Sequence, residues 1–416
     1  MKTWLSLAVR NLFRNGRRSF YTVLAMGLGF AAVNALGGFT AYIFSNLKDS
    51  YIYAQANGHL TIFKEGFLSE GKLYPTQYLL NEAELDVIRK TLSRHPEAII
   101  VTPQLHISGL LSNGEVSTIF IGAGRVPSDI QEINRRVTGV ARKVKLFDGE
   151  PLRDDMSFGI GLSQGLANQL KFTLGSDAVA MAPTVSGQIN ALDAKVLQLF
   201  NSPNEALEDK LATVPLEFAQ SLYDTTGADR MTVLLSNAAN PEQMKETLTR
   251  ELIEQGLKIE VKTWDELSPF YTKVRNMFQV IFFFAFVIVF TIVVMSVVNT
   301  LGMAIMERTR EIGTLRALGM KRRGIVGLFA LESVILGAFG SLLGVLLTLM
   351  AFVGMTLIEP TWIPPQMSRR VPLEIHLVPE YILGSMVLLT VLSVLAANLP
   401  ARKAARMEIV NALGHT

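Results

Sequence analysis

The sequence predicts an α-helical membrane protein with four transmembrane helices and a large α/β extracytoplasmic domain inserted between helices 1 and 2. Four long blocks are almost free of charge, basic residues crowd their flanks, and the long segment between the first two blocks has ordinary globular composition. Only 18% of the 416 residues are charged and 49% are hydrophobic, with a mean hydropathy of +0.32. Soluble proteins carry about 25% charged residues, so part of this chain faces lipid.

Each apolar block is long enough to cross a bilayer, which takes about 20 helical residues. The predicted spans are 20–46, 273–305, 324–358 and 380–399. The first block could also be a cleaved signal peptide, but its uncharged run exceeds the ~7–15 residues typical of one. We therefore expect it to persist as transmembrane helix 1.

Lysine and arginine in the short flanking segments set the orientation, because they favour the cytoplasmic side of the membrane. They precede span 1, separate spans 2 and 3 and follow span 4, so both termini are expected in the cytoplasm of a bacterium, with the chain in its inner membrane. The remaining segments are a cytoplasmic amphipathic N-terminal helix (1–19), a periplasmic α/β domain with stalk ends (47–272), a cytoplasmic coupling helix (306–323), a short periplasmic loop (359–379) and a cytoplasmic C-terminal tail (400–416).

The exported segment shows mixed α/β patterns and is large enough to bury its own core. Its ends, Ser45–Gln55 and Trp264–Met277, are amphipathic and lead into the spans, so we expect the membrane helices to continue outward as a stalk. Predicted strands are His59–Phe63, Ala98–Thr102, Ser117–Gly122, Ala178–Ala182, Met231–Leu235 and Lys258–Lys262. Predicted helices are Glu82–Ser93, Gly161–Leu170, Leu216–Tyr223 and Pro241–Gln255.

Several classes of chemistry lack their residues in this chain. It has no G-x-x-x-x-G-K-[ST] phosphate loop, so it does not bind ATP in that way. Cysteine is absent and the five histidines are scattered without metal-ligand spacing. A net charge of +3 without a basic stripe argues against nucleic acid. We expect a protein that is not an enzyme and holds no metal.

One motif offers an enzymatic alternative. Gly161-Leu162-Ser163-Gln164-Gly165 matches G-x-S-x-G, the turn that presents the nucleophilic serine of hydrolases. Such a turn needs a buried strand directly before it, and the residues before Gly161 make a poor strand. The pattern fits a helix N-terminus better, with Leu162, Leu166 and Leu170 on one face. A membrane-anchored esterase remains the less favoured reading and predicts labelling of Ser163 by a fluorophosphonate.

The third span contains an acidic residue and a repeat of small residues. Glu332 is expected to face a helix or a polar cavity, because an ionisable group in lipid is expensive. Proton or ion coupling is one reading, and a structural hydrogen bond near the cytoplasmic interface is the favoured one. Gly337, Gly340 and Gly344 are spaced for close approach of another helix or subunit.

The loop between spans 2 and 3 carries the most information. Residues 307–323 alternate acidic and basic residues and place Ile312, Leu315 and Leu318 at helical spacing, bounded by Gly313 and Gly319. A loop that only fixes topology would not need this pattern. It predicts a short amphipathic helix on the surface of a cytoplasmic partner.

Residues 310–319, R-E-I-G-x-x-R-A-L-G, resemble the signature of FtsX-type permeases, the membrane subunits of the MacB and lipoprotein-releasing branch (type VII) of ABC transporters. The N-terminal stretch 10–15, Glu332 with its following glycines, and P-A-R-K-A-A-R at 400–406 with Asn411-Ala412-Leu413 are similar to further elements of this family. Residues 161–175 resemble an element of the MacB-like periplasmic domain, with Ser176 inserted before Asp177.

The resemblance implies mechanotransmission: two permease subunits, as a homo- or heterodimer, each seat a cytoplasmic helix in a separate ABC ATPase that binds ATP and Mg. No cofactor is implied on this chain, and a periplasmic adaptor or lipoprotein carrier is a further possible partner beside membrane lipid. We expect the ATPase-coupling residues to be Arg308, Arg310, Glu311, Ile312, Gly313, Leu315, Arg316, Leu318 and Gly319. Charge pairs would set register, and Ile312 and Leu315 would supply burial.

The resemblance leaves three hypotheses about what the protein acts on. Chain length and the missing ATPase favour extraction of lipoproteins or other lipidated cargo from the outer leaflet of the inner membrane. A MacB-like efflux permease for peptides or drugs, with a separate ATPase, is the first alternative. An FtsX-like signalling subunit that activates a periplasmic partner, without transport, is the alternative from another class.

Overall fold

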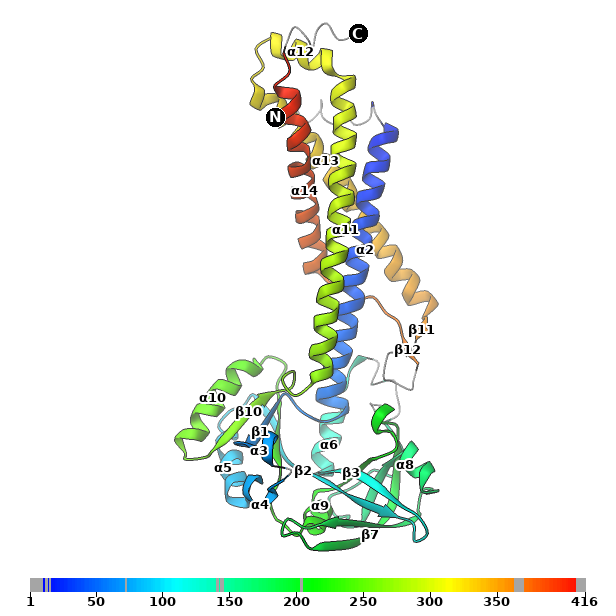
Figure 1. The fold of residues 1–416 in the computed structure, drawn as a ribbon, viewed down its shortest axis with the longest axis vertical. Coiled ribbons are helices and arrows are strands. Elements are labelled where there is room, and N and C mark those ends of the chain that lie inside the picture. The colour runs from blue at the N-terminus through cyan, green and yellow to red at the C-terminus, as the bar shows by residue number, and fades with distance from the viewer. Residues whose placement is uncertain are drawn as a thin grey trace. The chain divides into compact units, whose positions relative to one another are not determined.

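The computed structural model describes residues 10, 11, 14, 16–71, 73–139, 142, 146–202, 205–362 and 370–408. The predictions for Asn411-Ala412-Leu413 and most of the N-terminal helix 1–19 lie outside these residues. The chain divides into two compact units (Figure 1). The helical unit comprises Met1–Phe44, Val274–Thr361 and Pro372–Thr416, and the α/β unit comprises Ser45–Lys273 and Trp362–Val371.

Within the described part of the chain, four helices are long and apolar enough to cross a membrane, as the sequence predicts. They are α2 (Gly16–Asp49), α11 (Pro269–Glu307), α13 (Arg322–Ile358) and α14 (Pro379–Ala405). A shorter helix, α12 (Thr309–Ala317), lies between α11 and α13 in the chain, and the strands β11 (Thr361–Trp362) and β12 (Val371–Pro372) pair between α13 and α14. Much of the surface of α11 is exposed phenylalanine, valine and isoleucine, as expected for a helix in lipid.

Small residues bring the helices of the helical unit into close contact. A Cβ atom added at Gly340 would lie 2.8 Å from Cβ of Met26, and one added at Gly344 would lie 2.6 Å from Cβ of Phe30, both on α2. At Gly337 it would lie 3.1 Å from Cα of Thr390 on α14. The small-residue face of α13 therefore packs on two helices of the same chain.

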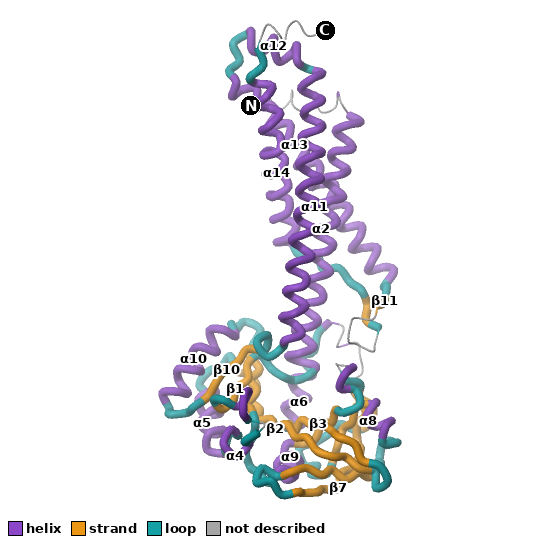
Figure 2. The backbone as a smooth tube through the Cα atoms, viewed as in Figure 1, coloured by secondary structure: helices purple, strands orange, loops and turns teal. Residues whose placement is uncertain are grey.

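The α/β unit is built on a ten-stranded sheet (Figure 2). Nine strands follow the order β10-β1-β9-β2-β3-β8-β5-β7-β4, and β6 pairs with β2 and β7. The strands are β1 (Leu60–Lys64), β2 (Ala98–Ser112), β3 (Ser117–Arg125), β4 (Phe147–Gly149), β5 (Gly159–Ser163), β6 (Asp177–Pro183), β7 (Ile189–Phe200), β8 (Leu211–Pro215), β9 (Arg230–Leu235) and β10 (Ile259–Thr263).

Among the residues that the structure describes, eight short helices and one π-helix accompany the sheet. They are η1 (Ser50–Ala54, a π-helix that continues α2), α3 (Phe67–Glu70), α4 (Pro75–Tyr78), α5 (Glu82–Leu92), α6 (Pro127–Asn134), α8 (Gln164–Gln169), η2 (Glu205–Leu207), α9 (Leu216–Tyr223) and α10 (Pro241–Glu254). Local sequence explains their ends: Asn81 and Glu84 form a capping box at α5, and Asn240 caps α10 ahead of Pro241.

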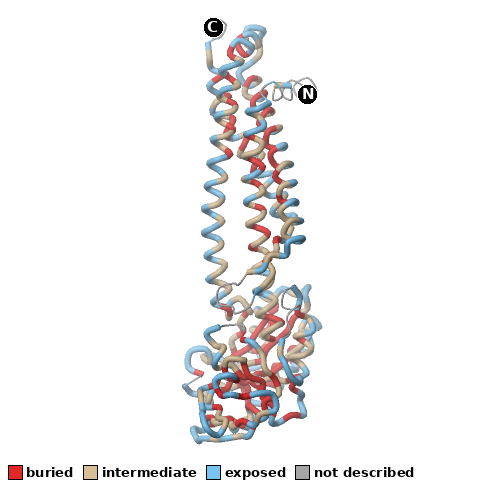
Figure 3. Tube along the Cα trace, turned by 90° about the vertical axis from the view of Figure 1, so that its right-hand side faces the viewer, coloured by how far each residue is buried: buried red, intermediate tan, exposed pale blue. Residues whose placement is uncertain are grey.

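The long strand β2 joins two halves of the sheet. Its first part pairs antiparallel with β9, and its second part pairs with β3 and β6. One core lies around β1, β9, β10, α5 and α10, and a second lies around β3, β5 to β8, α8 and α9. Figure 3 shows buried positions in the interior of the α/β unit.

All six predicted strands form, each with at least one shifted end, but the predicted helix Gly161–Leu170 is wrong in its first part. Gly159–Ser163 is strand β5, and the helix α8 begins only at Gln164. The glycines hid this strand because glycine has low strand propensity. Packing overrides propensity here: a Cβ at Gly161 would lie 2.7 Å from Cγ2 of Thr213 on the neighbouring strand.

The predicted stalk ends also differ in detail. The first continues beyond the predicted span as α2 and then as the π-helix η1, which ends at Ala54. The second begins as helix only at Pro269, whereas Trp264–Leu267 forms turns. Proline at the first helical position explains this start, because its fixed backbone angle suits the first turn.

His59 should make the stability of the α/β unit sensitive to acid. The side chain is buried, and its Nδ1 accepts a hydrogen bond from the Leu235 N–H at 3.1 Å. Burial, with a smaller effect of Lys48, lowers its pKa from 6.5 to about 4. Because protonation then favours the unfolded state, stability is complete above pH 6.5 and declines as the pH falls toward 4.

We expect the free energy of unfolding to fall by about 2 kcal/mol between pH 7 and pH 5 through this residue. Denaturant titrations of the full chain in detergent would measure it, followed by tryptophan fluorescence. His59→Gln should remove this part of the pH dependence. An unchanged pH profile in the variant would contradict the assignment.

Candidate functional site at helix α12

Helix α12 has defined ends. Arg308 lies at the break between α11 and α12, and the Thr309 hydroxyl donates to the carbonyl of Ile305 at 3.0 Å. At the other end Gly319 has a φ of +97°. Its N–H donates to the main-chain carbonyl of Arg316, and the Met320 N–H donates to the main-chain carbonyl of Leu315. This hydrogen-bond pair is the Schellman arrangement, which favours glycine at the left-handed position.

The two sides of α12 differ in burial. Ile312 is 2% exposed, and it packs with Thr309 and Gly313 against the rest of the helical unit. Leu315 is half-buried against the same core. Leu318, at the end of the helix, is 81% exposed. The expectation that Ile312 supplies burial against a partner is therefore wrong, because its side chain is already enclosed by its own chain.

The other predicted coupling residues are charged or lie on the exposed side. Arg310, Glu311, Leu318 and Gly319 are exposed, and Arg316 is half-buried. The Arg316 guanidinium donates to the main-chain carbonyl of Met407 after α14. Arg316 therefore joins α12 to the C-terminal segment of its own chain.

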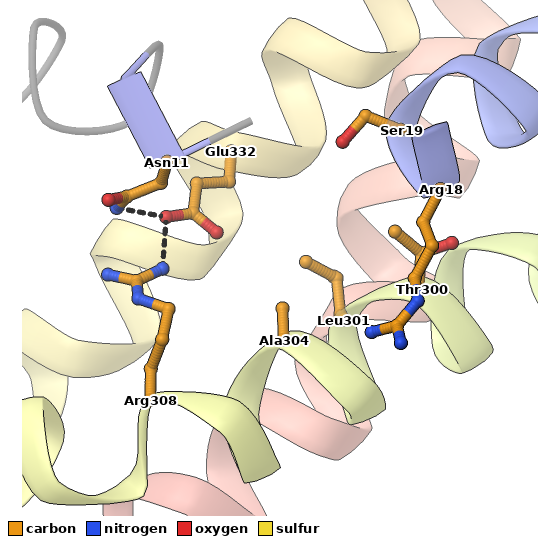
Figure 4. Close-up of a pocket in the computed structure, with 8 residues that line it drawn as sticks. All are labelled: Asn11, Arg18, Ser19, Thr300, Leu301, Ala304, Arg308 and Glu332. Carbon is orange, nitrogen blue, oxygen red and sulfur yellow. Dashed lines mark hydrogen bonds and ion pairs between the residues drawn. The ribbon is translucent and has the colours of Figure 1, made fainter. Parts of the chain in front are cut away.

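Glu332 of α13 forms the centre of a buried polar cluster with Arg308 and Asn11 (Figure 4). Its Oε1 accepts from Nη1 of Arg308 at 2.9 Å and from Nδ2 of Asn11 at 2.7 Å. The side chains of Glu332 and Arg308 are 3% and 11% exposed. The favoured structural reading of Glu332 fits this geometry, because the carboxylate is paired and hydrogen-bonded.

Exposed ion pairs surround this cluster. Nη1 of Arg14 lies 2.7 Å from Oε1 of Glu311, Nε of Arg308 donates to Oε2 of Glu311 at 3.0 Å, and Arg18 pairs with Glu307. Burial alone would raise the pKa of Glu311, but the hydrogen bonds from Arg308 and Arg14 lower it overall. Glu311 therefore stays ionised at neutral pH.

A cavity of about 20 Å³ adjoins Glu332. This volume is enough for one water molecule and too small for a substrate. In Figure 4 both hydrogen bonds reach one carboxylate oxygen, and the other oxygen points across the cavity. The cavity is lined by Asn11, Arg18, Ser19, Thr300, Leu301, Ala304, Arg308 and Glu332.

Ser163 does not have the setting of a nucleophile, although a strand and a helix do flank it. The residue is fully buried, and its hydroxyl donates to the Leu211 carbonyl at 3.0 Å. Its backbone angles, φ −64° and ψ 148°, are unstrained. No group of three potential metal ligands occurs among the described residues.

Sequence reasoning missed the partners of the predicted site residues. Asn11 and Glu332 are 321 positions apart, and Arg14 and Glu311 are 297 apart. The arginines before the first span indicated orientation, and nothing in a single sequence paired them with these glutamates. A second buried cluster, Asp229 with Arg230 and His106 in the α/β unit, was also missed.

Comparison with known proteins finds a family match within the helical unit. Residues 282–409 match the family model of the FtsX-like permease C-terminal domain. The macrolide export ATP-binding/permease proteins MacB of Escherichia coli (strain K12) and Salmonella typhimurium are 29% and 28% identical over 185 residues, 44% of this chain. The chain spans only 27% of the length of these relatives.

Two solved structures resemble the chain weakly. The periplasmic region of MacB from Actinobacillus actinomycetemcomitans aligns with a TM-score of 0.38 and 17% identity, over 54% of this chain and 96% of that one. The extracellular domain of the noncanonic ABC-type transporter YknZ from Gram-positive bacteria aligns with a TM-score of 0.35 and 16% identity, over 50% of this chain and 100% of that one. The family match and the MacB relatives confirm the predicted resemblance.

Proposed function

Since residues 282–409 match the FtsX-like permease C-terminal domain, we propose that this chain is an ABC transporter permease of the FtsX/MacB type. In this proposal it transmits the conformational change of a separate ATPase to its own α/β unit. The chain itself performs no catalysis. ATP and Mg bind the partner, which docks on α12. Both termini and α12 then face the cytoplasm of an inner membrane, as the arginine and lysine distribution supports.

The exposed side of α12 carries this proposal. A nine-residue helix is too short to persist alone in water, and here Ile312 and the Schellman end hold it in place. Leu318, which directly follows the last helical residue Ala317, is 81% exposed beside charged residues. A large apolar side chain with a charged rim is typical of a protein contact.

Replacing Leu318 with aspartate should disrupt this contact. Burying an exposed leucine side chain contributes about 1.5–3 kcal/mol, and burying an unpaired carboxylate in its place adds a further penalty. We expect co-purification of the tagged chain with its genomically adjacent ATPase to fall by at least tenfold. Stimulation of ATP hydrolysis should fall with it.

Ile189→Asp is the matched control, because Ile189 is 85% exposed on β7 of the α/β unit. This variant should keep full ATPase binding. Equal binding by Leu318→Asp and the wild-type chain, with both inserted in the membrane, would reject α12 as the docking site.

The cargo that we propose is amphiphilic. Ala191, Met181, Leu110 and Ile119 lie opposite one another across β7, β6, β2 and β3. Leu110 and Ile119 are exposed, on the face opposite to the buried Leu111 and Phe120. An apolar row of this kind on a sheet face suits acyl chains or other apolar groups.

Two cargo classes fit such a surface. Lipoproteins or other lipidated molecules of the outer leaflet are the first, and the MacB relatives favour export of a hydrophobic drug or peptide as the second. Spheroplasts depleted of the chain distinguish them. Retention of palmitate-labelled lipoproteins in the inner membrane supports release, whereas unchanged lipoproteins with increased sensitivity to macrolides supports efflux.

We also propose a second permease copy or paralogue as a partner, with a periplasmic adaptor or carrier. The long exposed apolar faces of α11 and α13 leave room for such a neighbour beside lipid. Mass measurement of the complex in nanodiscs would count the permease chains.

A further inference from the structure

We propose that Arg308 is the positioning residue of α12, and that its buried ion pair with Glu332 makes α12 and the first turns of α13 move as one body. The proposal rests on the proposed function, in which α12 is the surface on which the ATPase acts. It concerns how a displacement of α12 that the ATPase produces is transmitted to α13.

Arg308 is placed to join three helices. It follows the last residue of α11 and precedes the first residue of α12, with φ −112° and ψ 17° outside the helical region. Its guanidinium bonds one carboxylate on each of the following helices, Glu311 of α12 and Glu332 of α13. The guanidinium also lies 5.9 Å from the ring centre of Phe329, one turn before Glu332.

Burial distinguishes this pair from its neighbours. Arg308 and Glu332 are nearly enclosed, so separating them would leave two unpaired charges away from water. The Arg14–Glu311 pair is 71% and 45% exposed, and water replaces it at little cost. A displacement of α12 can therefore open the exposed pair, while the buried pair holds.

The remainder of α13 can carry the displacement onward. Gly340 and Gly344 lie in close contact with Met26 and Phe30 of α2, and Gly337 packs against Thr390 of α14. Because these helices are so closely packed, α13 cannot shift at these contacts without displacing α2 and α14. Without the Arg308 pair, the link between α12 and α13 would reduce mainly to the connecting turn, because α12 packs chiefly against α14.

Spin labels can test this directly, because the chain has no cysteine to remove. We would introduce cysteine at Thr314, exposed on α12, and at Leu342, exposed on α13. Double electron–electron resonance on the full chain in nanodiscs, with and without the ATPase in its nucleotide-free and vanadate-trapped states, gives the distance distribution. The wild-type chain should show one narrow distance in every state.

Arg308→Ala should broaden that distribution at least twofold. Glu332→Gln, which preserves the shape of the side chain and an acceptor, should broaden it less. Arg14→Ala, which opens the exposed pair, is the matched control and should leave the distribution unchanged.

An unchanged width in folded Arg308→Ala and Glu332→Gln would overturn the proposal. Failure of the ATPase to bind the wild-type chain would instead reject the proposed function. The two failures are distinguishable, because the broadening is expected in the permease alone as well.

Discussion

Replacing Gly344 with valine should destabilise the helical unit by about 3 kcal/mol, which is the upper part of the range for overpacking. A Cβ at this position would lie 2.5 Å from Cδ1 and 2.6 Å from Cβ of Phe30. The Cβ of Phe30 is fixed to its backbone, so rotation of the ring does not relieve the contact. Either α2 or α13 must move away, and the other close contacts between the two helices weaken with it.

Reversible unfolding in mixed detergent and SDS micelles would measure this effect. Gly354→Val on the same helix is the matched control, because a Cβ at Gly354 meets nothing within 4 Å. The control should unfold within about 0.5 kcal/mol of the wild-type chain, as surface substitutions do. Equal stabilities of the two variants would show that α2 and α13 do not depend on this contact.

Replacing Asp229 with alanine should destabilise the α/β unit by about 3–5 kcal/mol, the range for removing one partner of a buried ion pair. The Asp229 side chain is 4% exposed, Arg230 donates to both of its oxygens at 3.0 and 2.9 Å, and His106 lies 3.0 Å away. Burial alone would raise the pKa of Asp229, but Arg230 and His106 lower it well below its usual range. The variant leaves Arg230 partly buried without its carboxylate.

Denaturation followed by Trp264 fluorescence would report this loss, in a chain whose two other tryptophans, Trp4 and Trp362, are replaced by phenylalanine. Asp155→Ala is the control, because Asp155 and its partner Arg153 are 75% and 62% exposed. That change should cost less than about 1 kcal/mol. A stability loss of the same small size for Asp229→Ala would refute the importance of the buried cluster.

The parts of the fold that depend on local composition could be predicted from the sequence. A transmembrane helix needs a long uncharged run, and a helix such as α10 has its own cap at Asn240. Strand β5 could not be predicted, because Gly159 and Gly161 form a strand only where Val196 and Thr213 of neighbouring strands pair with it. Its conformation is dictated by tertiary contact.

The candidate site could likewise be predicted only where it depends on local sequence. The amphipathic spacing in residues 307–323 predicts a helix, and Gly319 marks its end. The sequence could not tell which side of the helix its own chain covers, so Ile312 was assigned to a partner. The partners of Glu332 required the three-dimensional structure, because Asn11 and Arg308 come from different segments of the chain.

The shared strand β2 has a mechanical consequence for the α/β unit. Gln104 belongs to both ladders, opposite Arg230 of β9 and opposite Arg125 of β3. No flexible linker lies between the halves at this point. A force applied to one half therefore acts directly on the hydrogen bonds of the other. We therefore expect the α/β unit to move as one rigid body, so that a force applied at one end is transmitted to the other through the shared strand.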